Sequence, residues 1–159
     1  LTPTAVFPLC TALAFSLYQI VTRKIVGREN PLTTLFYTAL VGAAVTSIGS
    51  VEGPLVLIAG GDGKGASFAS VAAALRGREC AAVLLGRDRE LLASELAAVC
   101  PVHRVAGMSD AVSQAAALAR PGWTVLLAPA CSSLDMFRDY AARGAAFSTA
   151  VRALGGGDA

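Results

Sequence analysis

Apolar and polar positions divide the chain into two stretches with different patterns. No residue from Pro3 to Thr22 carries a charge, and after a polar turn a second uncharged run extends from Pro31 to Val51. The runs hold 20 and 21 residues, and about 20 apolar residues in a helix can cross the hydrocarbon core of a membrane. We therefore expect residues 1–50 to form an all-α hairpin of two transmembrane-like helices. A pair of buried helices in a soluble protein is the alternative.

From Gly53 onward, short apolar runs alternate with amphipathic segments. Apolar runs that end in small residues predict buried parallel strands, and the segments between them predict helices. This order repeats four times with short connections, which is typical of a Rossmann-like α/β domain with a doubly wound parallel sheet. The expected strands are residues 54–61, 80–86, 101–107 and 123–130, and the expected helices are residues 67–77, 87–99, 109–122 and 132–154. We expect Ser109 to be the N-cap of the third helix, and Ser132 or Ser133 that of the fourth.

The charges follow the same division. Residues 1–50 carry four charged side chains, whereas residues 51–159 carry ten positive and ten negative ones. Balanced charge gives no basic surface for nucleic acid, so we expect no nucleic-acid partner. The four cysteines have no C-x-x-C spacing and there is one histidine, so we interpret the cysteines as buried, reduced thiols and expect no metal site. Because the chain starts at Leu1, we expect a fragment of a longer protein.

The first expected strand runs into the sequence GGDGKG at positions 60–65. A phosphate-binding P-loop needs glycine, four further residues and then Gly-Lys-Ser/Thr. Here a glycine follows Lys64 and the upstream glycine position is Ile58, so the P-loop is excluded. A solvated turn and a dinucleotide-binding loop of the pattern Gly-x-Gly-x-x-Gly/Ala stay open as alternatives. The residues that fit this last pattern are Gly61, Gly63 and Ala66.

Several polar residues converge at the carboxyl edge of the expected sheet, where open parallel sheets bind their ligands. Lys64 presents an ammonium group there, and Asp62 could hold it in place. The last helix is expected to begin at the same edge, where its first amides and Ser132 or Ser133 would form an anion site. Tyr140, on the first turns of that helix, could cap the pocket, although it could also be an ordinary half-buried aromatic residue. This arrangement predicts a site for a small carboxylate or phosphate.

Three segments resemble the C-terminal domain of the Mur ligases, in particular the members that add D-glutamate to UDP-N-acetylmuramoyl-L-alanine. They are LVLIAGGDGKGASF, AVLLGRD and PGWTVLLAPACSSLDMFRDYAARGAAF, and the resemblance covers residues 53–154. It implies ATP-dependent amide formation in cytoplasmic peptidoglycan synthesis, in which this domain carries the incoming D-glutamate. ATP and Mg²⁺ would serve the complete enzyme, and we expect neither cofactor in this chain.

The resemblance also implies roles for individual residues. Lys64 would pair with a carboxylate of D-glutamate, and Asp62 would orient Lys64. Ser133 and the backbone amide of Leu134 would hold carboxylate as well, and Tyr140 stands where the family has an aromatic residue near the ligand. No catalytic residue is expected. The chain departs from the family pattern at two positions, which are Ala128 in place of serine and Ser67 in place of aspartate.

No segment resembles the UDP-binding domain or the central ATPase domain of these ligases. We therefore expect this chain to bind D-glutamate without joining it to the muramoyl precursor. A noncatalytic module that binds small carboxylates is the alternative that the residues support without the resemblance.

Residues 1–50 resemble two neighbouring helices of the EamA-like drug/metabolite transporters. A transporter fragment is therefore a further alternative, with membrane association through residues 3–50 if they insert. Arg23, Lys24 and Arg28 in the connecting turn would place that turn in the cytoplasm. Because residues 51–159 would then follow on the opposite side, we expect a chimeric join of two gene fragments, with a domain boundary after residue 50.

Overall fold

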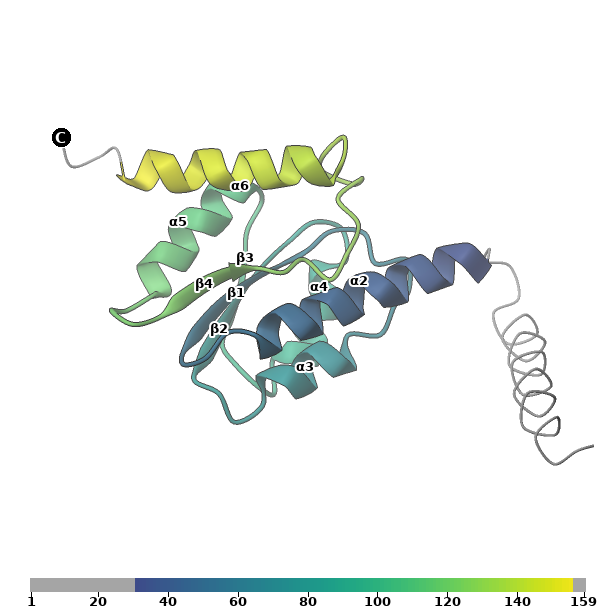
Figure 1. Ribbon diagram of the computed structural model, residues 1–159, viewed down its shortest axis with the longest axis horizontal. Helices are drawn as coiled ribbons and strands as arrows, with labels where there is room; N and C mark the ends of the chain where they lie inside the picture. Colours follow the sequence, from purple (N-terminus) through teal and green to yellow (C-terminus); the bar gives the residue numbers. More distant parts are fainter. Residues whose placement is uncertain (1–30, 156–159) are drawn as a thin grey trace, which may run out of the picture. The chain divides into compact units, whose positions relative to one another are not determined.

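The structure is a computed structural model that describes residues 31–155, with side chains from Leu35 onward (Figure 1). Strands and helices alternate from residue 55 onward in the order expected from the sequence. The strands are β1 (Leu55–Gly60), β2 (Cys80–Leu85), β3 (Val102–Arg104) and β4 (Thr124–Leu127). The helices are α2 (Pro31–Gly49), α3 (Ala69–Leu75), α4 (Arg89–Leu96), α5 (Met108–Leu118) and α6 (Tyr140–Gly155).

The four strands form one sheet in the order β3-β2-β1-β4, and every pairing is parallel. This confirms the expected doubly wound α/β fold. The chain moves outward from β1 through β2 to β3, and then returns through α5 to place β4 on the other side of β1. In such sheets ligands bind outside the carboxyl ends of the strands where the order reverses. Here that point lies between the ends of β1 and β4.

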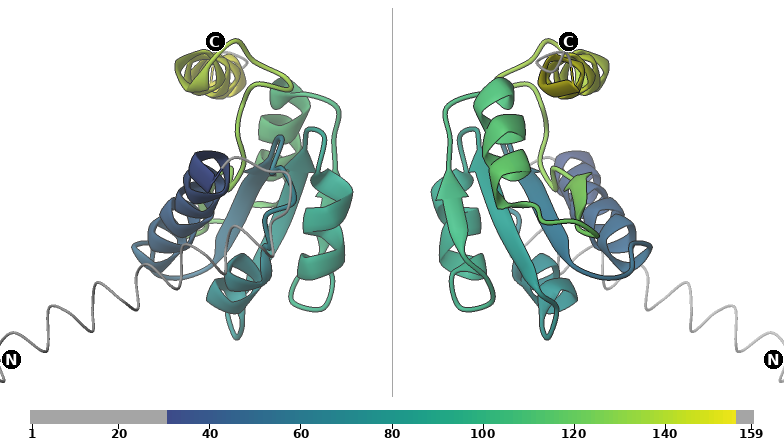
Figure 2. Two further views of the ribbon diagram at one scale, coloured as in Figure 1. Left: turned by 90° about the vertical axis from the view of Figure 1, so that its right-hand side faces the viewer. Right: turned by 90° about the vertical axis from the view of Figure 1, so that its left-hand side faces the viewer.

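Helices cover both faces of the sheet (Figure 2). Alternate side chains of β1 and β2 enter two apolar clusters, one formed with α2, α3 and α4 and the other with α5 and α6. All residues of β1 and β2 are buried. Strands covered on both faces are continuously apolar, which is why these two were visible in the sequence.

Helix α2 contacts the first of these clusters along one face. Its buried side chains recur every three or four residues, as in an ordinary amphipathic helix. They are Tyr37, Val41, Ala44 and Ile48. Burying a valine or isoleucine side chain contributes about 1.5–3 kcal/mol, so this face contributes to the stability of the fold. The contacts lie before residue 51, on the other side of the expected domain boundary.

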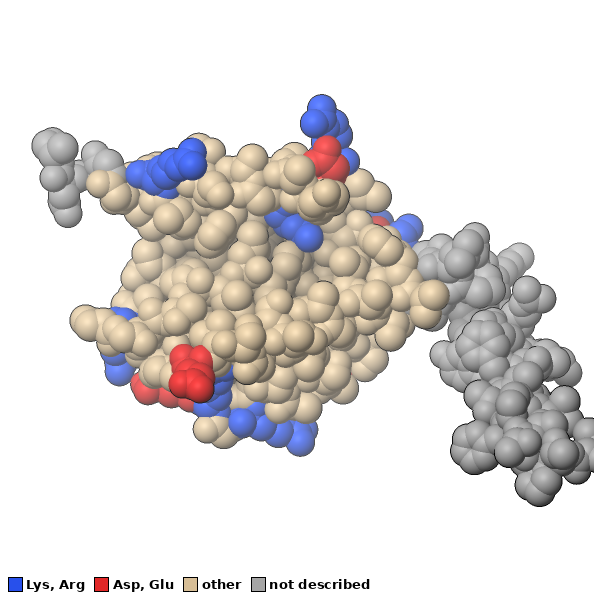
Figure 3. Space-filling view, in the orientation of Figure 1, with Lys and Arg blue, Asp and Glu red and all other residues tan. Residues whose placement is uncertain are grey.

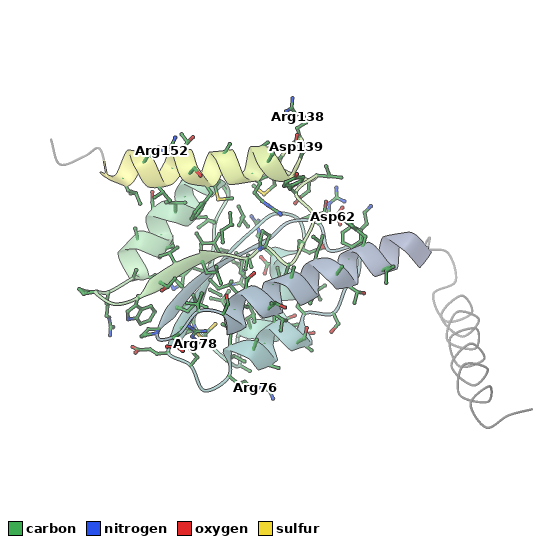
Figure 4. The ribbon with its side chains drawn as sticks, in the orientation of Figure 1. Asp62, Arg76, Arg78, Arg138, Asp139 and Arg152 are labelled. Atoms are coloured by element: carbon green, nitrogen blue, oxygen red, sulfur yellow. The ribbon has the colours of Figure 1, made fainter. Side chains whose placement is uncertain are left out.

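Arg78 holds the chain between α2 and β1. Its guanidinium donates hydrogen bonds to three backbone carbonyls, those of Ile48, Val51 and Gly53. Figure 4 shows Arg78 at the end of the sheet opposite to Asp62. The Ile48 carbonyl, in the last turn of α2, thus accepts hydrogen bonds from both Arg78 and the Val51 amide.

The expected transmembrane-like hairpin finds no support in the described part of the chain. Its first helix, residues 3–22, lies outside the described residues. Between residues 31 and 155, no helix combines the length and the apolar character that crossing a membrane requires.

The last helix begins later than expected. Neither Ser132 nor Ser133 is its N-cap, because α6 starts at Tyr140. The carboxylate of Asp139 accepts a hydrogen bond from the Ala142 amide at 2.7 Å, which is the geometry of an N-cap. Before it, only one turn forms, in which the Ser133 carbonyl accepts the amides of residues 136 and 137. The expectation failed because the Ser132 backbone pairs with another loop.

The start of α5 also differs from the expectation. The N-cap position is Gly107, with φ −146°, and no side chain caps the helix. Ser109 therefore lies inside the first turn. Met108 begins the helix, is 6% exposed and packs in the apolar cluster with β1 and β2.

Candidate functional site

The end of β1 lies against the segment that follows β4. We call these segments the glycine loop, Gly60–Gly65, and the serine loop, Ala130–Asp139. Asp62 and Ser132 form an isolated antiparallel bridge, with N–O distances of 3.2 and 3.0 Å. Gly61 permits this approach, because its φ is +132° and a Cβ atom there would lie 2.0 Å from the Ser132 carbonyl oxygen. The bridge brings the two sequence-predicted halves of the site together.

Asp62 is a buried carboxylate with two cations beside it. The residue is 8% exposed, and its Oδ1 accepts the Lys64 backbone amide at 3.1 Å. Its Oδ2 lies 3.7 Å from the Lys64 Nζ and accepts a hydrogen bond from Arg87 Nη1 at 3.1 Å. Asp62 therefore contacts the Lys64 ammonium, as expected, and also Arg87, which the sequence analysis did not single out.

The turn between β2 and α4 connects the two loops. Asp88 Oδ2 accepts the Gly63 amide at 2.6 Å, and the Asp88 amide donates to the Gly61 carbonyl at 3.0 Å. The Arg87 amide donates to Asp135 Oδ2 at 2.8 Å. The glycine loop and the serine loop are thus fixed by consecutive residues of a third loop.

A small pocket lies where the serine loop passes the ends of β1 and β4. Most of its lining is apolar, and the polar residues that line it are Ser133, Asp135 and Arg143. The Oδ1 atom of Asp135 is buried and has no hydrogen-bond partner among the described residues. Buried acceptors are almost always paired, so this pocket suits a hydrogen-bond donor.

Arg143 reaches from α6 to the serine loop. Its Nη1 donates to the Cys131 carbonyl at 3.0 Å. Burial lowers the pKa of the guanidinium, while the neighbouring Cys131 and Asp135 oppose that change. An arginine stays charged nonetheless, so Arg143 provides a fixed positive charge below the loop.

Cys131 is fully buried beneath the glycine loop. Burial raises the pKa of its thiol to about 12, and the carboxylates of Asp88 and Asp135 act in the same direction. The thiolate is the reactive form of cysteine, so Cys131 is a packing residue and not a nucleophile. Cys80 and Cys100 are also buried and free, as the sequence indicated for them, and Cys10 lies outside the described residues.

The predicted site residues differ in how the structure places them. Lys64 has a side chain that is 47% exposed, Ser133 is buried, and Leu134 is 70% exposed. The Leu134 amide donates to the Ser132 hydroxyl at 3.4 Å. Tyr140 is 81% exposed and does not line the pocket. The loops bring Lys64, Ser133 and Leu134 to the carboxyl edge of the sheet, and Tyr140 begins α6 directly after the serine loop.

One part of the predicted anion site is wrong. The N-terminus of a long helix was expected at Ser132 or Ser133, whereas the helix starts at Tyr140. The amides near Ser133 therefore belong to a single turn, and the dipole of α6 does not start there.

Four charged residues that build the site were not expected from the sequence, namely Arg87, Asp88, Asp135 and Arg143. Two of them directly follow the expected second strand, in the sequence GRD. The carboxyl ends of neighbouring parallel strands share one edge. Charged residues that directly follow a predicted strand are therefore a sequence signal for Arg87 and Asp88. Asp135 and Arg143 could not be found in this way, because their positions depend on the path of the serine loop.

The charges around the site occur in small groups, such as Asp62 with Lys64 and Arg87. Figure 3 shows a face with mostly uncharged residues, on which lysines and arginines stand in small separate groups. In Figure 4, Asp62 lies beside the segment that leads to α6, and Arg138 and Asp139 lie at the start of α6. The binding potential of the site therefore comes from a few individual side chains.

The family model and the individual relatives that match this chain belong to the same family. Residues 38–131 match the family described as Mur ligase, glutamate ligase domain. The chain is 49% identical over 114 residues to a UDP-N-acetylmuramoylalanine--D-glutamate ligase of Methylococcus capsulatus, covering 72% of this chain and 25% of that protein. It is 53% identical over 114 residues to the ligase of the same name from Pseudomonas syringae, covering 70% of this chain and 25% of that protein.

A third ligase of that name, from Geotalea daltonii, is 46% identical over 118 residues, covering 74% of this chain and 26% of that protein. The chain thus spans about a quarter of the length of these relatives. The family match begins at residue 38 and so includes the part of α2 that contacts the sheet. The chain belongs to the Mur ligase family, within its glutamate ligase domain.

Proposed function

We propose that this domain binds D-glutamate for a UDP-N-acetylmuramoylalanine–D-glutamate ligase of peptidoglycan synthesis. The relatives that carry this name are 46–53% identical to the chain, which supports the substrate. The observation that carries the proposal is the Asp62–Ser132 bridge. Through it, Lys64 and the serine loop come to one edge of the sheet.

The proposed roles follow from the chemistry of the ligand, which has two carboxylates and one ammonium group. Lys64 pairs with a carboxylate, since its side chain is half exposed above the sheet edge. Asp62 orients the lysine. The Ser133 hydroxyl donates a hydrogen bond to carboxylate, and the Leu134 amide does so in place of its long 3.4 Å bond to the Ser132 hydroxyl. Tyr140 lies near the ligand only if the complete ligase brings the ligand close to α6.

We assign ATP and Mg²⁺ to the complete ligase and not to these residues. Lys64 is followed by Gly65, so the loop lacks the hydroxyl with which a P-loop holds magnesium. Among the residues described, no group of three or more His, Cys, Asp or Glu side chains could hold a metal ion. In this proposal the domain binds and orients the amino acid, in the cytoplasm where ATP is available.

A noncatalytic module for small carboxylates is the second candidate. The same lysine and serine loop support it, and it differs from the first only in its selectivity. Binding of D-glutamate in preference to L-glutamate and succinate favours the ligase domain, whereas equal binding of the three favours the general module.

The experiment is a calorimetric titration of the 159-residue chain with D-glutamate. We expect binding in the millimolar range or tighter, and about tenfold weaker binding by Lys64→Ala, because a hydrogen bond to a charged group contributes about 1.5–3 kcal/mol. Arg76→Ala is the matched control, since this exposed cation lies at the opposite end of the sheet (Figure 4). Absence of D-glutamate binding, or equal affinity in Lys64→Ala, contradicts the proposal.

A further inference from the structure

We propose that Arg87 is the second cation of the carboxylate site and selects a ligand with two carboxylates. This inference rests on the proposed function of the site. It concerns the turn between β2 and α4, from which Arg87 extends toward the glycine loop.

Arg87 and Lys64 contact the same atom. Arg87 Nη1 lies 3.1 Å and Lys64 Nζ 3.7 Å from Asp62 Oδ2. The two cations come from different loops, and the buried carboxylate holds them side by side. Two carboxylates of one small ligand can therefore each reach one cation, one at Lys64 and the other at Arg87.

The exposure of the three side chains indicates where a ligand would approach. The Asp62 side chain is 12% exposed, whereas that of Lys64 is 47% and that of Arg87 is 64% exposed. The carboxylate thus lies below the cations, which face solvent. A ligand can contact the cations from outside while Asp62 keeps its place.

The charges explain why a second cation is needed. Lys64 and Asp62 form a neutral pair, which by itself has little attraction for a further carboxylate. Arg87 places a second cation beside that pair. The carboxylate of Asp88 balances this charge, but its Oδ2 accepts the Gly63 amide at 2.6 Å, so the exposed Lys64 and Arg87 are the groups that meet an incoming carboxylate. A guanidinium also presents paired N–H donors that match the two oxygens of a carboxylate.

The backbone of Arg87 is fixed even though its side chain is exposed. Its amide donates to Asp135 Oδ2 at 2.8 Å, and Asp135 follows Ser133 and Leu134 in the serine loop. The base of the Arg87 side chain is therefore placed between the two loops that carry the other carboxylate-binding groups.

The test compares three ligands on the full chain: D-glutamate, D-glutamine and D-isoglutamine. The two amides replace one or the other carboxylate by a neutral group of the same size. The variants are Arg87→Gln, Arg87→Lys and Lys64→Ala, and Arg89→Gln is the matched control. Arg89 has the same charge and lies two residues away, but it contacts Val105 and Glu90 instead of Asp62.

We expect Arg87→Gln to bind D-glutamate about fivefold more weakly, in line with the modest strength of exposed ion pairs. One of the two amides lacks the carboxylate that Arg87 binds. Arg87→Gln should bind that amide as tightly as the wild type does, and it should no longer bind D-glutamate more tightly than that amide. Arg87→Lys should recover part of the loss, and Arg89→Gln should match the wild type.

Two results overturn the role of Arg87 and leave the proposed function standing. One is unchanged D-glutamate affinity in Arg87→Gln while Lys64→Ala binds more weakly. The other is an equal loss for all three ligands in Arg87→Gln, which would mean that the loops had moved. A wild-type chain that binds none of the ligands overturns both proposals.

Discussion

Gly61 is the position at which the end of β1 comes closest to the serine loop. Replacing it by alanine places a methyl group 2.0 Å from the Ser132 carbonyl oxygen, on a backbone with φ +132°. We expect Gly61→Ala to open the Asp62–Ser132 bridge and to lower the free energy of unfolding by about 2–4 kcal/mol. Urea unfolding followed by circular dichroism measures this change.

Gly65 provides the control for this variant. It also has a positive φ, +77°, but a Cβ atom there meets nothing within 4 Å. Gly65→Ala should therefore cost only the backbone strain, about 1 kcal/mol. Equal losses in the two variants would show that the close approach to Ser132 does not matter.

Cys131 makes the stability of the domain depend on pH. The ordinary pKa of its thiol is 9.0, and burial raises the pKa in the folded protein to about 12. The thiol is neutral in both states below pH 9, so its contribution is fully present there. Above pH 9 the unfolded chain ionises first, and the contribution is lost as the pH rises toward 12.

We therefore expect the unfolding free energy of the wild type to fall more steeply between pH 9 and 10.5 than that of Cys131→Ala. The limiting difference in slope is about 1.4 kcal/mol per pH unit. Urea unfolding at several pH values measures both slopes, which should agree between pH 7 and 8. Parallel curves up to pH 10.5 would rule out this role of Cys131.

Arg78 fixes the segment between α2 and β1 by hydrogen bonds. Arg78→Ala removes three hydrogen bonds to backbone carbonyls, and we expect it to lower the unfolding free energy by about 1–3 kcal/mol. Arg76→Ala removes an exposed arginine two residues earlier, at the end of α3, and should change stability by less than about 0.5 kcal/mol. If both variants unfold at the same urea concentration as the wild type, Arg78 does not hold the two elements together.

The strands and most helices were predictable because their pattern is local. Leu55–Gly60 and Cys80–Leu85 are apolar throughout, and no tertiary information is needed to recognise them. The start of α6 was not predictable in this way. Ser132 and Asp139 are both good N-cap residues, and only the bridge between Ser132 and Asp62 decides that the helix begins after Asp139.

The candidate site was predictable in part for the same reason. Lys64, Asp62 and Ser133 follow strands whose carboxyl ends must meet at one edge, so their convergence was visible in the sequence. The positions of Asp135 and Arg143 depend on the path of the serine loop, and the exposure of Tyr140 depends on where α6 begins. Those features are tertiary, and the local pattern does not contain them.

At the scale of the whole molecule, the proposed binding site lies at the carboxyl ends of β1 and β4. The family match and the described core both include residues before position 51. The long uncharged run at residues 31–51 therefore has a local explanation in its described part. One face of α2 contacts the core. The face toward solvent carries small residues such as Gly42 and Ala43 together with the exposed Leu35 and Phe36. The function proposed for the domain depends on the binding edge alone.

The central claim is that D-glutamate binds at this edge, and a chemical-shift map of the full chain tests it most directly. We titrate ¹⁵N-labelled protein with D-glutamate and follow the backbone amides. The account predicts that the largest shifts occur in Gly61–Gly65, Arg87–Asp88 and Ser132–Asp135. Shifts concentrated at the opposite edge, near Glu79 and Trp123, or no shifts at saturating D-glutamate, would contradict it.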